Sequence, residues 1–175
     1  IRKKIGVLFG GDRGLYWRIS ARDNLDYFGN LYEIEPRILK KRIDELLEIL
    51  NLKSRQDENI ENFSRGMKQK IHIARCLLHD PKILFLDEPT LELDVEAAND
   101  LRNLIRSLKA QGKTIILTSH YMDGIEKLAD RIGLIFKGEL KAIDTVEKIK
   151  KRFNNPNLEE AYLAIIKQGR EEGLN

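Results

Sequence analysis

Two stretches decide how this chain folds: Phe63-Ser64-Arg65-Gly66-Met67-Lys68-Gln69 and, shortly after it, Ile83-Leu84-Phe85-Leu86-Asp87-Glu88-Pro89-Thr90. The first is typical of a helix that begins after Ser64, whose hydroxyl caps the first turn. The second is typical of a buried strand that ends in two adjacent carboxylates. A helix N-terminus suits an anion, and strand-end carboxylates suit Mg²⁺ and the activation of a water. Together they indicate a site for a nucleoside triphosphate.

The hydrophobic pattern divides the chain into a helical part and a part in which strands and helices alternate. Residues 20–80 carry amphipathic stripes, with a capping box at Ser20 and a proline, Pro36, suited to a first helical position. The expected strands cover residues 5–9, 82–87, 114–119 and 132–136. Residues 140–143 are expected to pair with the last strand as a hairpin. This order predicts an α/β fold with a parallel sheet and helices on its faces.

Length and composition fit one domain or one large piece of a domain. Of the 175 residues, 42% are hydrophobic and 34% are charged, which predicts a real core with a well-solvated surface. The net charge of +3 is too balanced to indicate nucleic acid, and none is expected as a partner. Cys76, the single cysteine, lies in an apolar helix and is interpreted as core. No signal peptide is visible in these residues, and no apolar run reaches membrane-spanning length.

Individual residues of this pattern have an ordinary interpretation beside the functional one. Asp87 is expected on the metal side, and Glu88 is expected to orient or deprotonate water. His120 follows the next strand at the same carboxyl edge, where it would contact a terminal phosphate or position Glu88. Taken singly, Asp87, Glu88 and His120 are also residues that commonly occur at solvent-exposed strand ends. Ser64 and Asp94 equally suit plain helix caps. Only their order and spacing favour a shared site.

In that order the residues resemble the ATP-binding cassette (ABC) ATPase family, over nearly the whole chain. Residues 63–67 are similar to its signature motif, usually Leu-Ser-Gly-Gly-Gln, with Arg65 replacing the first glycine and Met67 the glutamine. Ser64 and Gly66 are kept. The resemblance implies that these positions contact the γ-phosphate of ATP held by a partner subunit.

The second stretch carries the rest of the resemblance. Residues 83–87 resemble the Walker B strand, and Glu88 resembles the catalytic glutamate. Leu91-Glu92-Leu93-Asp94 is similar to the D-loop, usually Ser-Gly-Leu-Asp, and His120 matches the switch histidine. The resemblance therefore implies ATP and Mg²⁺ as cofactors. It implies catalytic roles for Glu88 and His120, a metal role for Asp87, and nucleotide contacts from Ser64, Arg65, Gly66, Met67 and Asp94.

Two departures limit what the resemblance implies for this polypeptide. The family's Q-loop glutamine falls at Gly10 or Gly11, which puts in doubt the usual contact to Mg²⁺ and water. No Walker A loop occurs, so upstream sequence is expected to be missing. The expectation is therefore a P-loop NTPase-like parallel sheet core that is incomplete, partly exposed and weak in ATP affinity alone, joined to an all-helical signature subdomain.

The resemblance also implies an organisation and partners. The expected segments are 1–19 (core strand and Q-loop), 20–80 (helical subdomain with the signature), 81–144 (catalytic core) and 145–175 (C-terminal helices). The expected protein powers an ABC transporter, of exporter type, as a head-to-tail dimer on transmembrane permease subunits. It would lie in the cytoplasm, peripheral on the inner face of the membrane. A non-transporter ABC ATPase and a truncated cassette unable to bind ATP alone remain as alternatives.

Overall fold

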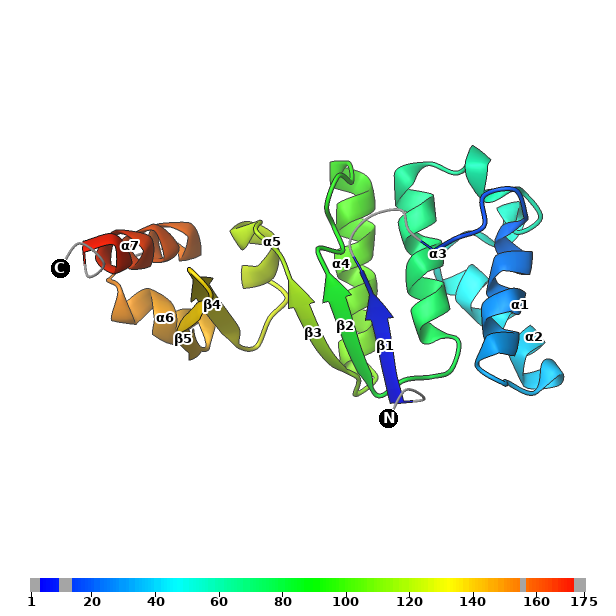
Figure 1. Ribbon diagram of the computed structural model, residues 1–175, viewed down its shortest axis with the longest axis horizontal. Coiled ribbons are helices and arrows are strands. Elements are labelled where there is room, and N and C mark those ends of the chain that lie inside the picture. Colours follow the sequence, from blue (N-terminus) through cyan, green and yellow to red (C-terminus); the bar gives the residue numbers. More distant parts are fainter. Residues whose placement is uncertain (1–3, 10–13, 155–156, 172–175) are drawn as a thin grey trace. The chain divides into compact units, whose positions relative to one another are not determined.

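The computed structural model describes residues 4–9, 14–154 and 157–171 (Figure 1). The chain forms two compact units, Ile1–Ser119 and His120–Asn175. The first unit contains both stretches with which the sequence analysis began. Within the described residues, no helix combines the length and the apolar character that crossing a bilayer requires.

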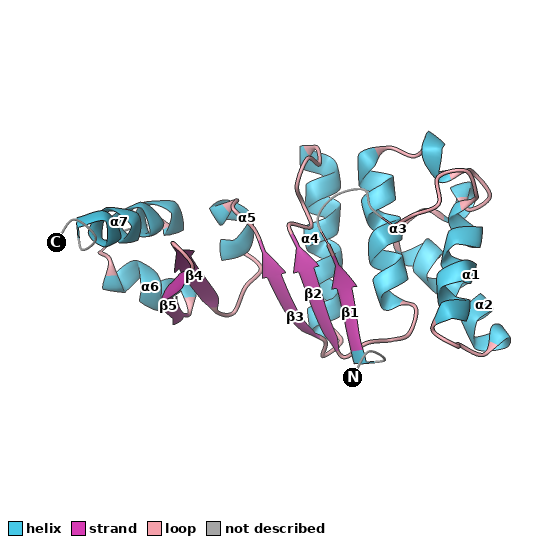
Figure 2. Cartoon of the chain, in the orientation of Figure 1, coloured by secondary structure: helices cyan, strands magenta, loops and turns pink. Residues whose placement is uncertain are grey.

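The centre of the first unit is a three-stranded parallel sheet, coloured magenta in Figure 2. Its strands are β1 (Ile5–Leu8), β2 (Ile83–Asp87) and β3 (Thr114–Thr118), in the order β1-β2-β3. The predicted parallel α/β core is thereby confirmed. The register sets the last residues of β2 and β3, Asp87 and Thr118, beside each other.

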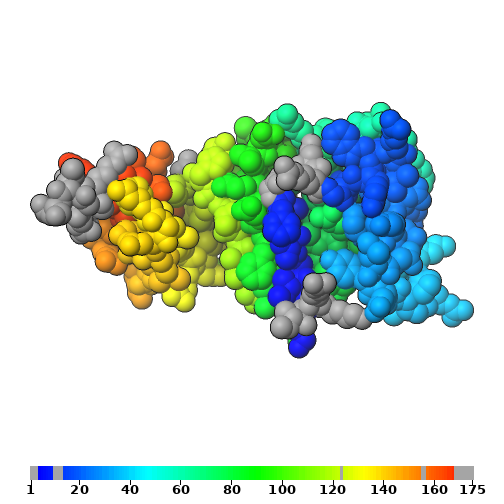
Figure 3. Space-filling view, viewed as in Figure 1, coloured from blue at the N-terminus to red at the C-terminus, as the bar shows by residue number. Residues whose placement is uncertain are grey.

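The two faces of this sheet differ in burial. One face carries Leu8, Leu84 and Leu86, each no more than 2% exposed. The other carries Val7, Phe85 and Ile116, which are register partners across the sheet and are 36%, 38% and 51% exposed. Figure 3 shows β1, in dark blue, at the molecular surface. Parallel sheets are normally covered on both faces, so the described residues leave one apolar face open, as the sequence analysis expected.

The helical part contains α1 (Ala21–Leu31), α2 (Pro36–Ile49), α3 (Arg65–Leu77) and the short 3₁₀ turns η2 (Lys53–Arg55) and η3 (Ile60–Asn62). Ser20 caps α1 by accepting a hydrogen bond from the Asp23 N–H at 3.0 Å, as its capping box predicts. Pro36 is the first residue of α2, also as predicted. The apolar stripes of these helices meet in a core in which Leu25, Leu47 and Ile60 are fully buried.

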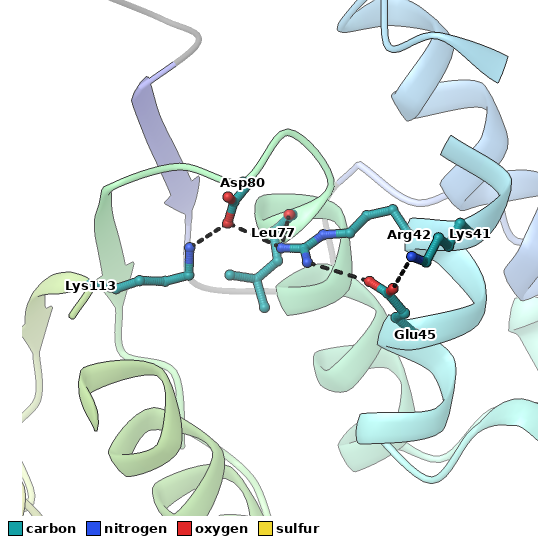
Figure 4. A network of polar contacts seen from close by, with 6 residues as sticks. All are labelled: Lys41, Arg42, Glu45, Leu77, Asp80 and Lys113. Atoms are coloured by element: carbon teal, nitrogen blue, oxygen red, sulfur yellow. Dashed lines mark hydrogen bonds and ion pairs between the residues drawn. The ribbon is translucent and has the colours of Figure 1, made fainter. Parts of the chain in front are cut away.

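A polar network ties α2 to the first unit's sheet (Figure 4). Arg42 of α2 donates hydrogen bonds to the Leu77 carbonyl at 3.3 Å and to Asp80 at 3.2 Å. Lys113, just before β3, donates to the same Asp80 oxygen at 2.7 Å. This hydrogen bond from Lys113 is the main reason why the pKa of Asp80 lies below its ordinary value. Arg42 therefore links α2 to Asp80 and to the end of α3 rather than serving only as a solvated charge on its helix.

Cys76 on α3 is part of the core, as the sequence indicated. Its thiol is buried and lies 3.0 Å from the Val7 carbonyl, to which it donates. Burial raises the pKa of this thiol to about 11, so the reactive thiolate is scarce at neutral pH. Burial, the hydrogen bond to Val7 and the raised pKa all fit a core role for Cys76.

The second unit consists of α5 (Met122–Glu126), β4 (Ile132–Phe136), β5 (Glu139–Asp144), α6 (Val146–Arg152) and α7 (Leu158–Glu171). Strands β4 and β5 pair antiparallel, which confirms the predicted hairpin. The strand at 132–136 was also expected to extend the parallel sheet, and here the expectation was wrong: β4 forms a separate two-stranded sheet with β5. The two-residue turn Lys137-Gly138, whose left-handed backbone (φ 48° and 79°) favours immediate reversal of the chain, explains why β4 pairs with β5.

Candidate functional site

The two predicted acids lie at the carboxyl end of β2. Asp87 is the last residue of that strand, and Glu88 is the first residue beyond it. Ligands of parallel α/β sheets bind at this end of the strands. The polypeptide reverses at once after Glu88, because the Leu91 N–H donates to the Glu88 carbonyl at 3.1 Å. The adjacent acids therefore sit at a sharp turn rather than along an extended segment.

The backbone of Glu88 is in the left-handed region, with φ of 45°. A residue with a Cβ adopts this conformation at a cost of about 1–3 kcal/mol, and such residues gather at functional sites. The turn at Glu88 thus holds a conformation that its own residue type does not favour. The surrounding hydrogen bonds supply the restraint.

Thr118, at the end of the neighbouring strand β3, contacts both acids. Its hydroxyl donates to Asp87 Oδ1 at 2.6 Å and accepts a hydrogen bond from the Glu88 N–H at 3.1 Å. Thr118 was not among the predicted site residues. The sequence signal for Thr118 is a hydroxyl residue at the end of the strand that neighbours the strand ending in Asp87. This signal can be interpreted only when the register of the two strands is known.

The predicted serine-capped helix is present as α3. Ser64 is its N-cap, and its hydroxyl accepts a hydrogen bond from the Met67 N–H at 3.2 Å. Arg65 is the first helical residue, and its side chain is 67% exposed. The sulfur of Met67 lies 3.2 Å from Arg55 Nη1, which donates to it. The first turn of α3 thus presents a positively charged side chain at the positive end of the helix dipole.

Two contacts connect α3 to the loop that follows the acids. Gln69 on α3 donates a hydrogen bond to the Pro89 carbonyl at 2.9 Å. Arg65 forms an ion pair with Glu92 at 3.0 Å, and Glu92 is a second left-handed residue with φ of 60°. The serine-led helix and the acidic turn are therefore linked within one subunit. Gln69 and Glu92 were not among the predicted site residues.

The start of α4 (Val95–Ala110) packs directly against the start of α3. Asp94 is the N-cap of α4 and accepts a hydrogen bond from the Ala97 N–H at 2.8 Å, which is the ordinary role that its position suggested. A Cβ atom on Gly66 would lie only 2.9 Å from the Cβ of Ala97. Glycine at position 66 therefore permits a close approach of two helices within this chain.

We expect Gly66→Ala to destabilise the protein by about 1–2 kcal/mol, because two methyl groups would overlap at the α3–α4 contact. Chemical denaturation measures this change. The double variant Gly66→Ala/Ala97→Gly removes the opposing methyl and should recover more than half of the loss, whereas equal losses in the single and double variants would show that the contact is not limiting.

Comparison with known proteins identifies the family. A family model described as "ABC transporter" matches residues 1–91. The ABC transporter ATP-binding protein NatA of Bacillus subtilis is 37% identical over 169 residues, which are 97% of this chain and 69% of NatA. This chain belongs to the ABC transporter ATP-binding proteins.

Two further comparisons agree with this family. The Nod factor export ATP-binding protein I of Neorhizobium galegae is 38% identical over 81% of this chain. The chain spans only 40% of that relative. A solved structure of an ATP-binding subunit of an ABC transporter superposes with a TM-score of 0.79 and 27% identity, covering 93% of this chain and 68% of the other.

The family assignment gives the remaining predicted positions their context. His120 begins the second compact unit, two residues beyond β3, and its ring lies 4.1 Å from that of Tyr121. Its convergence with Asp87 and Glu88 stays a prediction. Gly10 and Gly11, at which the Q-loop glutamine of an ABC ATPase would fall, lie outside the described residues.

The segment after those glycines is anchored by a residue that the sequence analysis missed. Asn24 on α1 is fully buried, and its Oδ1 accepts a hydrogen bond from the Tyr16 N–H at 2.8 Å. Its Nδ2 donates to the carbonyls of Tyr16 and Ser20, each at 2.9 Å. Neighbouring Trp17 stays 48% exposed, with Lys68 of α3 4.7 Å from its ring centre. A buried asparagine thus presents exposed aromatic residues beside α3 of this ABC protein.

Proposed function

We propose that this chain is the ATP-binding and ATP-hydrolysing subunit of an ABC transporter of the exporter type. The observation that carries the proposal is the linked arrangement around Asp87 and Glu88: Asp87 ends β2, Glu88 follows it directly, and the serine-led helix α3 is joined to the loop that follows them. The name of one relative, a Nod factor export protein, supports export as the direction.

The acids divide the chemistry between them. Mg²⁺ binds through one or two carboxylates together with phosphate oxygens, and it would neutralise charge on the phosphates during transfer. Within the described residues, no group of three or more histidine, cysteine or acidic side chains gathers as a metal cage. A single strand-end carboxylate such as Asp87 fits a cation that arrives with its nucleotide. Asp87 would hold that cation, and Glu88 would accept a proton from the attacking water.

The helix α3 serves the nucleotide of a second subunit. Its first-turn N–H groups and the guanidinium of Arg65 suit the terminal phosphate of ATP. Ser64, Gly66 and Met67 complete this turn. Two subunits would therefore face each other head to tail, each closing on the ATP of the other, with Asp94 and His120 at the same interface. Membrane-embedded permease subunits would convert this closure into transport on the inner face of the membrane.

A metal-site variant tests the proposal. In the protein that contains this chain, we expect Asp87→Asn to lower Mg²⁺-dependent ATP hydrolysis by about 100-fold or more, because the cation loses its carboxylate. Phosphate release measures the effect. The matched control is Asp100→Asn on α4, which removes an exposed ion pair with Lys70 and should leave hydrolysis within about threefold, as exposed pairs contribute little.

A wild-type protein that neither binds nor hydrolyses ATP would overturn the proposal in favour of a non-catalytic cassette. Equal rates in wild type and Asp87→Asn would remove the metal role of Asp87 and leave the family membership unaffected.

A further inference from the structure

We propose that Thr118 is a positioning residue that sets the geometry of both acids of the ATPase site, an inference that rests on the function proposed above. The residue lies at the end of β3 and touches Asp87 and Glu88 through one hydroxyl group. Its role is structural and indirect, because the hydroxyl acts through its neighbours.

The sheet register explains why residue 118 has this access. Asp87 and Thr118 are partners across β2 and β3, so their side chains project from the same face of the sheet. Neighbouring strands lie about 4.8 Å apart, a distance that a threonine hydroxyl and an aspartate carboxylate span with one hydrogen bond. Thr114, on the same face of β3, pairs instead with Ile83 at the opposite end of the strands.

The hydroxyl restrains the carboxylate of Asp87. A threonine hydroxyl has one proton to donate, and here that proton goes to Asp87 Oδ1 at 2.6 Å. Hydrogen bonds from hydroxyls to carboxylates are short and strong because the acceptor is charged. The bond engages Oδ1 and thereby fixes the plane of the carboxylate, which orients Oδ2 for a cation. Partners of metal ligands tune metal binding in this way.

The same hydroxyl restrains the backbone of Glu88. Its lone pair accepts the Glu88 N–H at 3.1 Å, and the Glu88 carbonyl accepts from the Leu91 N–H at 3.1 Å. Both peptide groups of this residue are therefore held while its φ is 45°, a conformation that glutamate rarely adopts. The direction of the Glu88 side chain depends on this backbone conformation. Thr118 thus couples the orientation of the metal-side acid to that of the base.

Replacing the hydroxyl by a methyl group tests the inference. Thr118→Val keeps the shape and the strand propensity of threonine but cannot donate or accept a hydrogen bond. In the protein that contains this chain, we expect kcat to fall by about 10–100-fold, and the Mg²⁺ concentration for half-maximal activity to rise by a similar factor. We expect the KM for ATP to change less than kcat, because the residue does not touch nucleotide.

A readout independent of turnover accompanies the kinetics. Amide hydrogen exchange should report faster exchange at Glu88 by about tenfold or more in Thr118→Val, with the Leu86 amide within the strand unchanged. Thr118→Ser retains the hydroxyl and should restore both kcat and the exchange rate to within about threefold of wild type. Thr114→Val, the same chemical change on the same face of β3, is the matched control and should behave as wild type.

The outcomes separate this proposal from the function on which it rests. A wild type that hydrolyses ATP, with Thr118→Val equal to it in kcat, Mg²⁺ requirement and Glu88 exchange, overturns the role of Thr118 alone. Failure of Thr118→Ser to restore activity would also overturn it, since the hydroxyl would not be the active element. A wild type without ATP hydrolysis is instead a failure of the proposed function.

Discussion

Glu88→Gln is expected to reduce ATP turnover by about 10²–10⁴-fold while ATP-driven dimerisation persists. Glutamine keeps the size and shape of glutamate but cannot accept a proton from water, and general bases contribute about this factor. Nucleotide binding should survive, because the substitution leaves Asp87 and the hydrogen bond from the Glu88 N–H to Thr118 in place.

Two measurements on the protein that contains this chain check this expectation: phosphate release for turnover, and size-exclusion chromatography with and without ATP for the dimer. Glu48→Gln on the exposed side of α2 is the matched control, since it makes the same chemical change away from the acidic turn. Unchanged hydrolysis in Glu88→Gln would exclude Glu88 as the base. If hydrolysis and dimerisation were lost together, Glu88 would have a role in nucleotide binding rather than as the catalytic base.

Asn24→Leu is expected to lower the free energy of unfolding by about 3 kcal/mol. The leucine would leave the part-buried N–H and C=O of Tyr16 without the side-chain partners that now satisfy them, and an unsatisfied buried group costs about 1–3 kcal/mol. Asn24 itself is 0% exposed, so water does not replace those bonds in the native packing. Urea denaturation measures the change.

The same substitution should release the segment that Asn24 anchors. Trp17 is the only tryptophan of the chain, so its fluorescence reports on this segment alone, and iodide quenching should increase in the variant. Asn30→Leu is the matched control: Asn30 lies on the same helix but is exposed, and its side-chain amide donates to Asp26 of the same helix at 2.8 Å and 3.0 Å. A stability loss below about 1 kcal/mol in Asn24→Leu would show that the network is not limiting.

The elements that were predicted correctly depend on local physics. Ser64 caps α3 and Ser20 caps α1 because a hydroxyl reaches an N–H three residues ahead, whatever the rest of the fold does. The strand that ends at Asp87 follows from an apolar run of fixed length. The β4–β5 hairpin follows from a two-residue turn. The family resemblance rests on these same short segments.

The local pattern was insufficient where a strand had more than one possible partner. Residues 132–136 have the apolar character of a parallel strand, yet β4 pairs with β5 in a separate sheet. The periodicity of apolar residues predicts which residues share a face of a strand, but it does not determine which other strand pairs with it. The pairing is set by the tight turn and by the cluster around Ile149 and Leu158 that covers one face of the hairpin.

The chain's own residues thus establish which groups can do chemistry: two acids at a strand end, a serine that begins a helix, and a histidine after the next strand. Folding in three dimensions establishes which residues act on them. Thr118 reaches Asp87 from 31 positions away, Gly66 meets Ala97, and Arg65 pairs with Glu92. Such contacts arise from strand register and helix packing, which sum over many residues, so no short segment of sequence contains them.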